Sequence, residues 1–306
     1  MSVQIQQLTK KYQNQLAVDG ISFEVPSGVV VGFLGPNGAG KSTTMKMLCG
    51  YVLPSSGSAQ VCGIDVVEYP REVKRKIGYL PEHNPLYLDM YVKEYLHFVA
   101  GLSGMKTNIS KKVKEMIDLT GLGVEQNKLI GQLSKGYRQR IGLAQALIHD
   151  PEVLILDEPT SGLDPNQITE IRKVIKTVGE KRTVILSTHI MQEVEAMCDR
   201  VIIINQGKIV ADDRLDALRQ KNLNAQCIQV KFKNSVSIQA LKAIKGVQKV
   251  EQLADNHMRV IADTNIDLQE HLFNFAVETK NILLEQKQEE QQLEHVFRAI
   301  TGAKDV

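Results

Sequence analysis

The sequence predicts an α/β protein, because short β-rich runs alternate with amphipathic helical patterns along most of the chain. Two runs, Val153–Leu156 and Val201–Ile204, are apolar at every position, which is typical of parallel strands covered by helices on both faces. A glycine-rich segment also stands between a β-rich run and a helical pattern that begins at Lys41. The strands expected here are Val3–Leu8, Ile21–Val25, Val29–Leu34, Val153–Asp157, Thr183–Ser187 and Val201–Ile204.

Length and composition allow two domains and disfavour several classes of protein. With 306 residues, 43% of them hydrophobic, the chain can form one large or two modest cores. Its 37 Lys and Arg nearly balance 35 Asp and Glu, so the net charge of +2 creates no field that attracts nucleic acid or anionic lipid. The four cysteines lack the spacing of a zinc site or a disulfide framework, which indicates free thiols in a reducing compartment.

No segment of the sequence indicates membrane insertion. The N-terminus carries no charged stretch followed by an apolar one, and no apolar run approaches the length that spans a bilayer. We therefore expect a cytoplasmic chain that contacts a membrane only through a partner.

The stretch from about residue 89 to 150 is mostly helical in pattern. Val92–Leu102 and Ile109–Leu119 are the candidate helices, and glycines separate them. A helical insertion in an α/β domain suits a partner-facing subdomain, although the same pattern fits helices that only cover the sheet.

The order of elements changes after about Leu223. The pattern becomes βαββαβ, the order of a ferredoxin-like unit, and ends in one more helix. We expect a first, α/β domain over residues 1–220 and a small α+β accessory domain over 221–306, joined by a hinge at Arg219–Asn224. An extension of the first sheet is the alternative. RNA binding is disfavoured there, because charges balance and the strands lack aromatic pairs. The expected strands are Cys227–Phe232, Val247–Leu253, His257–Ala262 and Ile282–Gln286, and the helices are Ile238–Ile244, Leu268–Val277 and Leu293–Ile300.

A phosphate-binding loop is the reason to expect a nucleotide in the first domain. The segment reads GPNGAGKST, a complete G-x-x-x-x-G-K-[ST] pattern between a strand and a helix, where backbone N–H groups and the helix N-terminus face the phosphates. Lys41 is expected to reach the β- and γ-phosphates and Ser42 to ligate Mg²⁺; the alternative is a glycine-rich turn without function. The loop consists of Gly35, Pro36, Asn37, Gly38, Ala39, Gly40, Lys41, Ser42 and Thr43.

An acidic pair decides among kinases, GTPases and ATPases. Asp157 ends the apolar run from Val153, which places its carboxylate beside Mg²⁺ at the edge of the sheet. Glu158 follows and can orient and deprotonate the attacking water; two turn acids are the alternative. A guanine-reading Asn-Lys-x-Asp motif is not found, since the run from Asn127 to Ile130 ends in the wrong residue. These residues favour an ATPase.

The run Leu133–Arg140 reads LSKGYRQR and supplies a third signal. Ser134 precedes a helical pattern that extends to Asp150, so its hydroxyl and the helix N-terminus make an anion site, although an ordinary N-cap fits as well. With the two motifs above, the run resembles the signature sequence, beginning LSGGQ, of the ATP-binding cassette (ABC) ATPases of ABC transporters. Lys135 and Tyr137 depart from that pattern.

The resemblance covers residues 1 to about 220 and implies a P-loop NTPase core with an antiparallel β subdomain and a helical subdomain. It also implies that Ser134 and Gly136 close on the γ-phosphate bound by the opposite subunit, so that two identical or paired cassettes enclose two ATP molecules. Ser161–Asp164 matches the family's D-loop, which links the two sites. His189 matches the switch histidine at the γ-phosphate, and Tyr12 matches the aromatic residue that stacks on adenine.

Glu82 stands where the family usually carries a glutamine that senses Mg²⁺ and the transporter. Its carboxylate can still reach the metal or the water, but its charge opposes the γ-phosphate unless Mg²⁺ screens it.

Further runs resemble the ABC-2 type exporters and, within them, the gliding-motility-associated (GldA-type) ATP-binding subunits of Bacteroidota. These are the segment from Tyr79 to Tyr87, the signature run, and the segment from Leu293 to Phe297. The resemblance implies a subunit that drives an integral membrane permease from the inner face of the cytoplasmic membrane. The alternative is a soluble ABC protein acting on ribosomes or DNA, which the near-neutral charge and the single phosphate loop disfavour.

Overall fold

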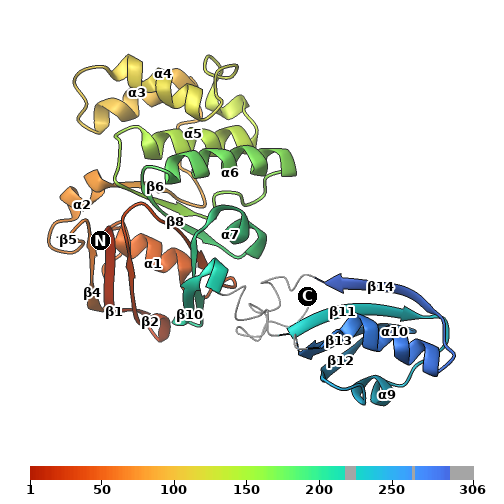
Figure 1. The fold of residues 1–306 in the computed structure, drawn as a ribbon. Coiled ribbons are helices and arrows are strands. Elements are labelled where there is room, and N and C mark those ends of the chain that lie inside the picture. The colour runs from red at the N-terminus through yellow and green to blue at the C-terminus, as the bar shows by residue number, and fades with distance from the viewer. Residues whose placement is uncertain (218–224, 264–265, 290–306) are drawn as a thin grey trace. The chain divides into compact units, whose positions relative to one another are not determined.

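The computed structural model describes residues 1–217, 225–263 and 266–289, which fall into two compact units that divide after Leu215 (Figure 1). The expected hinge at Arg219–Asn224 and the expected last helix, Leu293–Ile300, lie outside the described residues.

A six-stranded sheet forms the centre of the first unit, in the order β10-β9-β3-β8-β7-β6. All strand pairs are parallel except β10 with β9 at one edge. Every residue of β3, β7 and β8 is buried, which confirms the prediction of parallel strands covered on both faces. The strands are β3 (Val30–Leu34), β6 (Ile77–Leu80), β7 (Val153–Asp157), β8 (Thr183–Thr188), β9 (Arg200–Asn205) and β10 (Lys208–Arg214).

Successive residues of β7 enter two different cores. Leu154 and Leu156 belong to a core that includes buried residues of five helices, whereas Val153 and Ile155 belong to one that includes buried residues of α1 and of the second sheet. The helices of the first core are α3 (Val92–Leu102), α4 (Ile109–Leu119), α5 (Lys135–Leu147), α6 (Pro165–Gly179) and α7 (Met191–Met197), and α1 is Lys41–Leu48. Because successive side chains of β7 point to opposite faces, helices pack on one face of the sheet and the second sheet packs on the other.

The second sheet is antiparallel, in the order β2-β1-β4-β5, and agrees with the expected antiparallel subdomain. Its first hairpin is longer than predicted and places Tyr12 opposite Gln15. The strands are β1 (Val3–Tyr12), β2 (Gln15–Val25), β4 (Ser56–Val61) and β5 (Ile64–Asp65).

The helical part of the first unit contains α3, α4 and α5, which lie together at the top of Figure 1. The bounds of α3 and α4 are those predicted from the sequence. Helix α5 begins after Ser134, whose hydroxyl accepts a hydrogen bond from the N–H of Tyr137, and it ends three residues before the expected Asp150. Pro151 accounts for the early end, because it disfavours helical geometry at the residue before it. Two short helices, α2 (Pro70–Lys76) and α7 (Met191–Met197), and a 3₁₀ turn at Ile130–Gln132 complete the unit.

The second unit forms a sheet of its own, in the order β12-β13-β11-β14 with antiparallel pairs. This is the strand order of a ferredoxin-like unit, and in the described residues these four strands pair only with one another. Ile228 and Val230 on the sheet share a core with Leu241 and Leu272 on the helices. The elements are β11 (Ala225–Phe232), α9 (Ile238–Lys242), β12 (Val247–Ala254), β13 (His257–Asp263), α10 (Leu268–Glu278) and β14 (Leu283–Glu289).

None of the helices within the described ranges has the length and apolar character that crossing a membrane requires.

Candidate functional site

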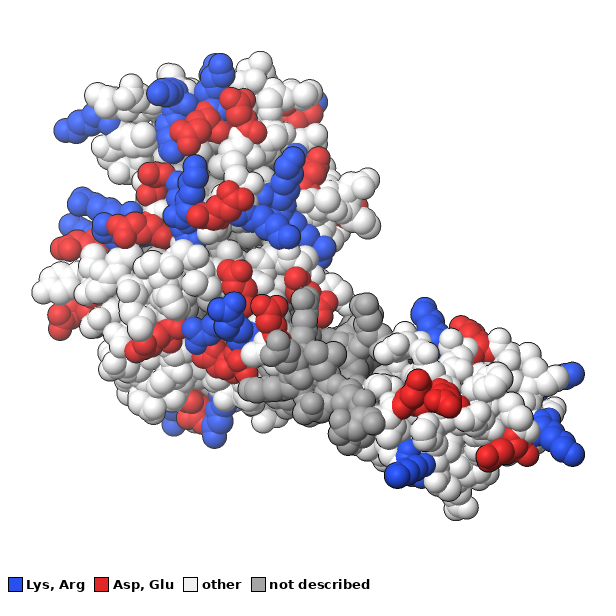
Figure 2. All heavy atoms as spheres, in the orientation of Figure 1, with Lys and Arg blue, Asp and Glu red and all other residues white. Residues whose placement is uncertain are grey.

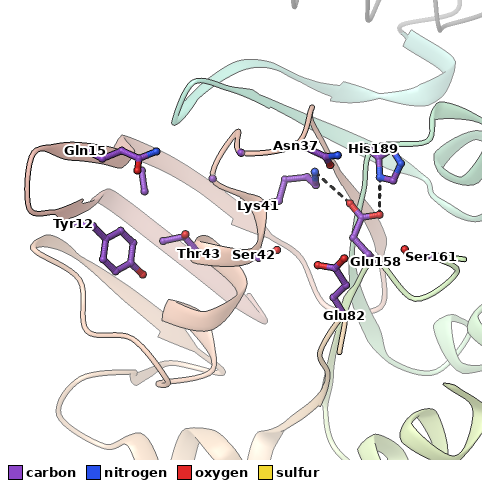
Figure 3. Close-up of a pocket in the computed structure, with 13 residues that line it drawn as sticks. Tyr12, Gln15, Asn37, Lys41, Ser42, Thr43, Glu82, Glu158, Ser161 and His189 are labelled. Carbon is purple, nitrogen blue, oxygen red and sulfur yellow. Dashed lines mark hydrogen bonds and ion pairs between the residues drawn. The ribbon is translucent and has the colours of Figure 1, made fainter. Parts of the chain in front are cut away.

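A pocket of about 500 Å³ lies where β3, β7 and β8 end, at the carboxyl edge of the parallel sheet. Figure 3 shows Glu158 between Lys41 and His189 at one end of this pocket and Tyr12 at the other. The lining residues are Tyr12, Gln15, Ala17, Asn37, Gly38, Gly40, Lys41, Ser42, Thr43, Glu82, Glu158, Ser161 and His189.

The loop from β3 to α1 forms one wall of the pocket. Gly40 is the N-cap of α1 and has a φ of 108°, a conformation that L side chains rarely adopt. A Cβ at this position would also lie 2.5 Å from the carbonyl oxygen of Ala17. Glycine therefore lets the loop turn tightly against β2 and directs the first N–H groups of α1, which have no partner within the helix, toward the pocket.

Lys41 is the buried cation of the site, with 6% of the residue exposed. Its Nζ donates to the carbonyl oxygens of Gly35 at 2.8 Å and Pro36 at 3.2 Å, and lies 3.3 Å from Oε1 of Glu158. The ammonium is thus held at the mouth of the loop, and an entering phosphate would compete with the Glu158 carboxylate for it.

Asp157 lies behind the lining residues, beside Ser42, and is 2% exposed. Its Oδ1 accepts hydrogen bonds from the hydroxyls of Ser42 at 3.0 Å and Ser187 at 2.5 Å. The Ser42 hydroxyl and the Asp157 carboxylate are therefore neighbours. Oxygen ligands of these two types are the ones that Mg²⁺ takes in phosphate sites. Glu82 also lines the pocket and offers a further carboxylate.

Glu158 and His189 form a pair across the ends of β7 and β8. Oε2 of Glu158 lies 2.9 Å from Nδ1 of His189, and the backbone N–H of Glu158 donates to the carbonyl oxygen of Ser187 at 3.1 Å. The backbone of Glu158 is left-handed, with φ at 49°, which costs a non-glycine residue about 1 kcal/mol or more. The fold holds this carboxylate in a strained position, which is characteristic of functional sites.

Most of the residues predicted from the sequence come together in this pocket. Ten of them line it: Tyr12, Asn37, Gly38, Gly40, Lys41, Ser42, Thr43, Glu82, Glu158 and His189. Gly35, Pro36 and Ala39 belong to the same loop, and Asp157 contacts Ser42. Ser134 and Gly136 are not among the lining residues of this single chain.

Sequence reasoning missed two lining residues, Gln15 and Ala17, and named Ser161 only as part of a motif. Gln15 and Ala17 follow Tyr12 across the first hairpin, so a prediction of that hairpin from Tyr12 onward would have found them.

The fold and the pocket define the class: an ATPase cassette with a phosphate loop, an acidic strand end and a helical subdomain. Three comparisons with known proteins agree. A family model described as "ABC transporter" matches residues 18–161. The bacitracin transport ATP-binding protein BcrA of Bacillus licheniformis is 38% identical over 254 residues, which cover 82% of this chain and 78% of BcrA. The Nod factor export ATP-binding protein I of Burkholderia pseudomallei is 35% identical, over 74% of this chain and 76% of that protein.

Among solved structures, the dimeric ATP-binding cassette MJ0796, in a post-hydrolysis state with ADP and Pi bound, superimposes with a TM-score of 0.65. The match covers 70% of this chain and 98% of MJ0796 at 24% identity, which shows a shared fold. The chain belongs to the family of ABC transporter ATP-binding subunits and is an ABC ATPase.

Proposed function

We propose that this chain is the ATP-hydrolysing subunit of an ABC-2 type exporter, and that two cassettes close on two MgATP to drive a separate integral membrane permease. In this proposal residues 1–220 are the ATP-binding domain, 221–306 are an accessory domain, and the chain works at the inner face of the cytoplasmic membrane. The transport and export functions of BcrA and of the Nod factor protein, which are properties of those relatives, support the direction of transport.

In this proposal the pocket and the residues beside it supply the parts that one cassette contributes to phosphoryl transfer. Lys41 binds the β- and γ-phosphates, Tyr12 stacks on the adenine, and the N–H groups from Asn37 to Thr43 cradle the phosphates. Ser42, Asp157 and Glu82 would hold Mg²⁺, which when bound neutralises charge on the phosphate oxygens. Glu158 orients the attacking water and accepts its proton, while His189 contacts the γ-phosphate.

The observation that carries the dimer is the position of the signature segment. Ser134 caps α5 and is exposed, yet neither Ser134 nor Gly136 lines the pocket described for this chain. A second cassette would bring its own Ser134 and Gly136 to this pocket. Ser134 and Gly136 of the first chain would in turn enter the pocket of the second cassette. The dimeric state of MJ0796 is a property of that protein and is transferred here only as part of the proposal.

Exposed aromatic and aliphatic side chains on the helical subdomain support a permease partner. Tyr87 is 53% exposed and its ring lies 5.7 Å from that of Phe98, which is 41% exposed. Leu88 and Tyr91 are exposed in the same stretch of chain. Exposed apolar side chains that gather in this way are typical of a protein interface.

A role in gliding motility is the most specific part of the proposal. It depends on the likeness of the segment from Tyr79 to Tyr87, of the signature run and of Leu293–Phe297 to the subunits of Bacteroidota. The permease encoded beside this chain would identify what is moved.

Action on ribosomes or DNA is the alternative function, and the charges disfavour it. Figure 2 shows Lys and Arg interspersed with Asp and Glu on the face drawn, with no continuous basic region. The experiment is affinity purification of the full chain from its native cell after mild solubilisation of the membranes. Recovery of an integral membrane permease supports the proposal, whereas recovery of ribosomes or DNA without a permease contradicts it.

A further inference from the structure

Glu193, on α7, is a buried carboxylate that the proposed mechanism does not use. The residue is 1% exposed, although an ionisable side chain is costly to bury unless its oxygens are bonded. Among the described residues no lysine or arginine forms an ion pair with it. Its partners are therefore informative about why the fold keeps it.

Two threonines satisfy the carboxylate, and each belongs to a different strand end. The hydroxyl of Thr160 donates to Oε1 of Glu193, and the hydroxyl of Thr188 donates to Oε2 at 2.7 Å. Thr160 is 3% exposed and Thr188 is fully buried, so water does not compete for either bond. One carboxylate thus connects the segment after β7 to the last residue of β8.

The two threonines flank the reactive pair. Thr160 stands two residues after Glu158, whose left-handed backbone must be held by its surroundings. Thr188 directly precedes His189, and its hydroxyl also accepts a hydrogen bond from the N–H of Ile190 at 3.1 Å, so both sides of His189 are anchored. The two segments are thus connected twice. On the pocket side Glu158 contacts His189 at 2.9 Å, and on the buried side both threonines bind Glu193.

Helix α7 makes a firm base for this arrangement. Val194, next to Glu193, is fully buried and lies against Gly32 of β3. The N–H of Asp199, just after the helix, donates to the carbonyl oxygen of Val30 on the same strand. Strand β3 leads into the phosphate loop. Because α7 packs on β3, Glu193 holds the ends of β7 and β8 in place relative to the phosphate loop.

We infer that Glu193 is a positioning residue for ATP hydrolysis, which sets the distance and direction between Glu158 and His189 through Thr160 and Thr188. This inference rests on the proposed roles of Glu158 and His189. It predicts that breaking either hydroxyl bond slows turnover without weakening ATP binding, because the phosphate loop and Tyr12 lie on other elements.

The test compares matched threonine variants of the full chain in steady-state ATPase assays, with ATP affinity and melting temperature measured on the same samples. Thr160→Val and Thr188→Val keep the shape of the side chain and remove the hydroxyl, whereas Thr160→Ser and Thr188→Ser keep the hydroxyl. Thr177→Val is the control, since Thr177 is exposed on α6 and its hydroxyl donates to the carbonyl oxygen of Lys173 in the same helix.

We expect each valine variant to lose about tenfold or more in kcat while KM and the ATP Kd change less than about twofold, and each serine variant to restore kcat. Glu193→Ala should resemble the valine variants and add little further loss when combined with Thr160→Val, because both remove one shared interaction. The threonine variants keep the test decisive should Glu193→Ala not fold.

The inference is overturned if the valine variants turn over like the wild type, or if they lose ATP affinity and thermal stability in parallel and serine does not rescue them. Glu158→Gln in the same assay separates the role inferred for Glu193 from the role proposed for Glu158. Loss of turnover in Glu158→Gln with normal turnover in the valine variants removes only the role of Glu193. Normal turnover in Glu158→Gln removes the proposed role of Glu158, on which this inference rests, and absence of ATP hydrolysis in the wild-type chain removes the proposed function.

Discussion

Lys41 and Glu158 form a close buried pair: Nζ of the lysine lies 3.3 Å from Oε1 of the glutamate, and their side chains are 6% and 9% exposed. The same carboxylate contacts His189 through its other oxygen. Glu158 therefore stands between Lys41, the proposed phosphate-binding cation, and His189, the proposed switch histidine. In the proposed function, a γ-phosphate that takes over Lys41 leaves Glu158 in contact with His189 and able to accept a proton from water.

Glu158→Gln tests this role of the carboxylate. The amide keeps the size of the side chain but cannot accept the proton, so we expect turnover to fall about a hundredfold or more. ATP affinity should stay equal or increase, because a negative charge beside the γ-phosphate is removed. Steady-state hydrolysis and a nucleotide titration measure the two effects. Glu152→Gln, at an exposed glutamate paired with Lys76, is the control. Hydrolysis within tenfold of the wild type would contradict the assignment.

Lys41→Ala should abolish nucleotide binding, because it removes the only buried ammonium that lines the pocket as described. It also leaves Glu158 without a lysine partner, which turns the phosphate site more negative. Lys46→Ala changes an exposed lysine on the same helix and should bind ATP normally. A fluorescent ATP analogue titrated into both variants gives the comparison, and equal affinities would refute the role of Lys41.

Gly78→Ala should destabilise the first unit, since a Cβ there would lie 2.1 Å from the carbonyl oxygen of Ala146 on α5. Backbone must shift to admit it, and we expect a loss of about 3 kcal/mol in the free energy of unfolding. The matched variant is Gly101→Ala on α3, where no atom lies within 4 Å and the change should stabilise by about 0.5 kcal/mol. Chemical denaturation measures both; a neutral Gly78→Ala would show that β6 and α5 are not in close contact.

Stability should fall in acid partly because of His149. Burial lowers the pKa of this imidazole below its ordinary 6.5, although a hydrogen bond to the carbonyl oxygen of Ile77 opposes the shift. Below about pH 6.5 the unfolded chain binds a proton that the folded chain resists, so this contribution to stability is present above that pH and is lost as the pH falls toward the lower folded pKa. His149→Gln should flatten the loss between pH 7.5 and 5, measured as the free energy of unfolding. An identical slope in the variant would contradict the prediction.

The central strands of the parallel sheet were predictable from the sequence, and several strands at or near the sheet edges were not. Both ends of Val153–Asp157 were predicted correctly, because in an α/β fold a short and fully apolar run indicates a buried strand of the parallel sheet. Strand β10 was missed, since it pairs only with β9 at the sheet edge and its side chains alternate between exposed and half-buried. Strand β4 was missed as well, because its sequence SGSAQV has no strand pattern and only its pairing with β1 and β5 makes it a strand.

The candidate site shows the same division. Residues within one motif, such as Lys41 and Ser42, were readable because spacing alone places them on one loop. The role of Glu193 was not, because its partner Thr160 stands 33 residues away in the chain and comes near only when β7 and β8 pair. Likewise, the contact of Ser187 with Asp157 depends on the register between those two strands.

The central claim is that the site is completed by a second cassette, and the mass of Glu158→Gln in saturating MgATP tests it most directly. Light scattering coupled to size-exclusion chromatography should give twice the 34.1 kDa of one chain with MgATP and a single chain without it. A further Ser134→Arg substitution should prevent the dimer, because its side chain would block the anion site at the start of α5. A mass of one chain at full nucleotide occupancy would contradict the account.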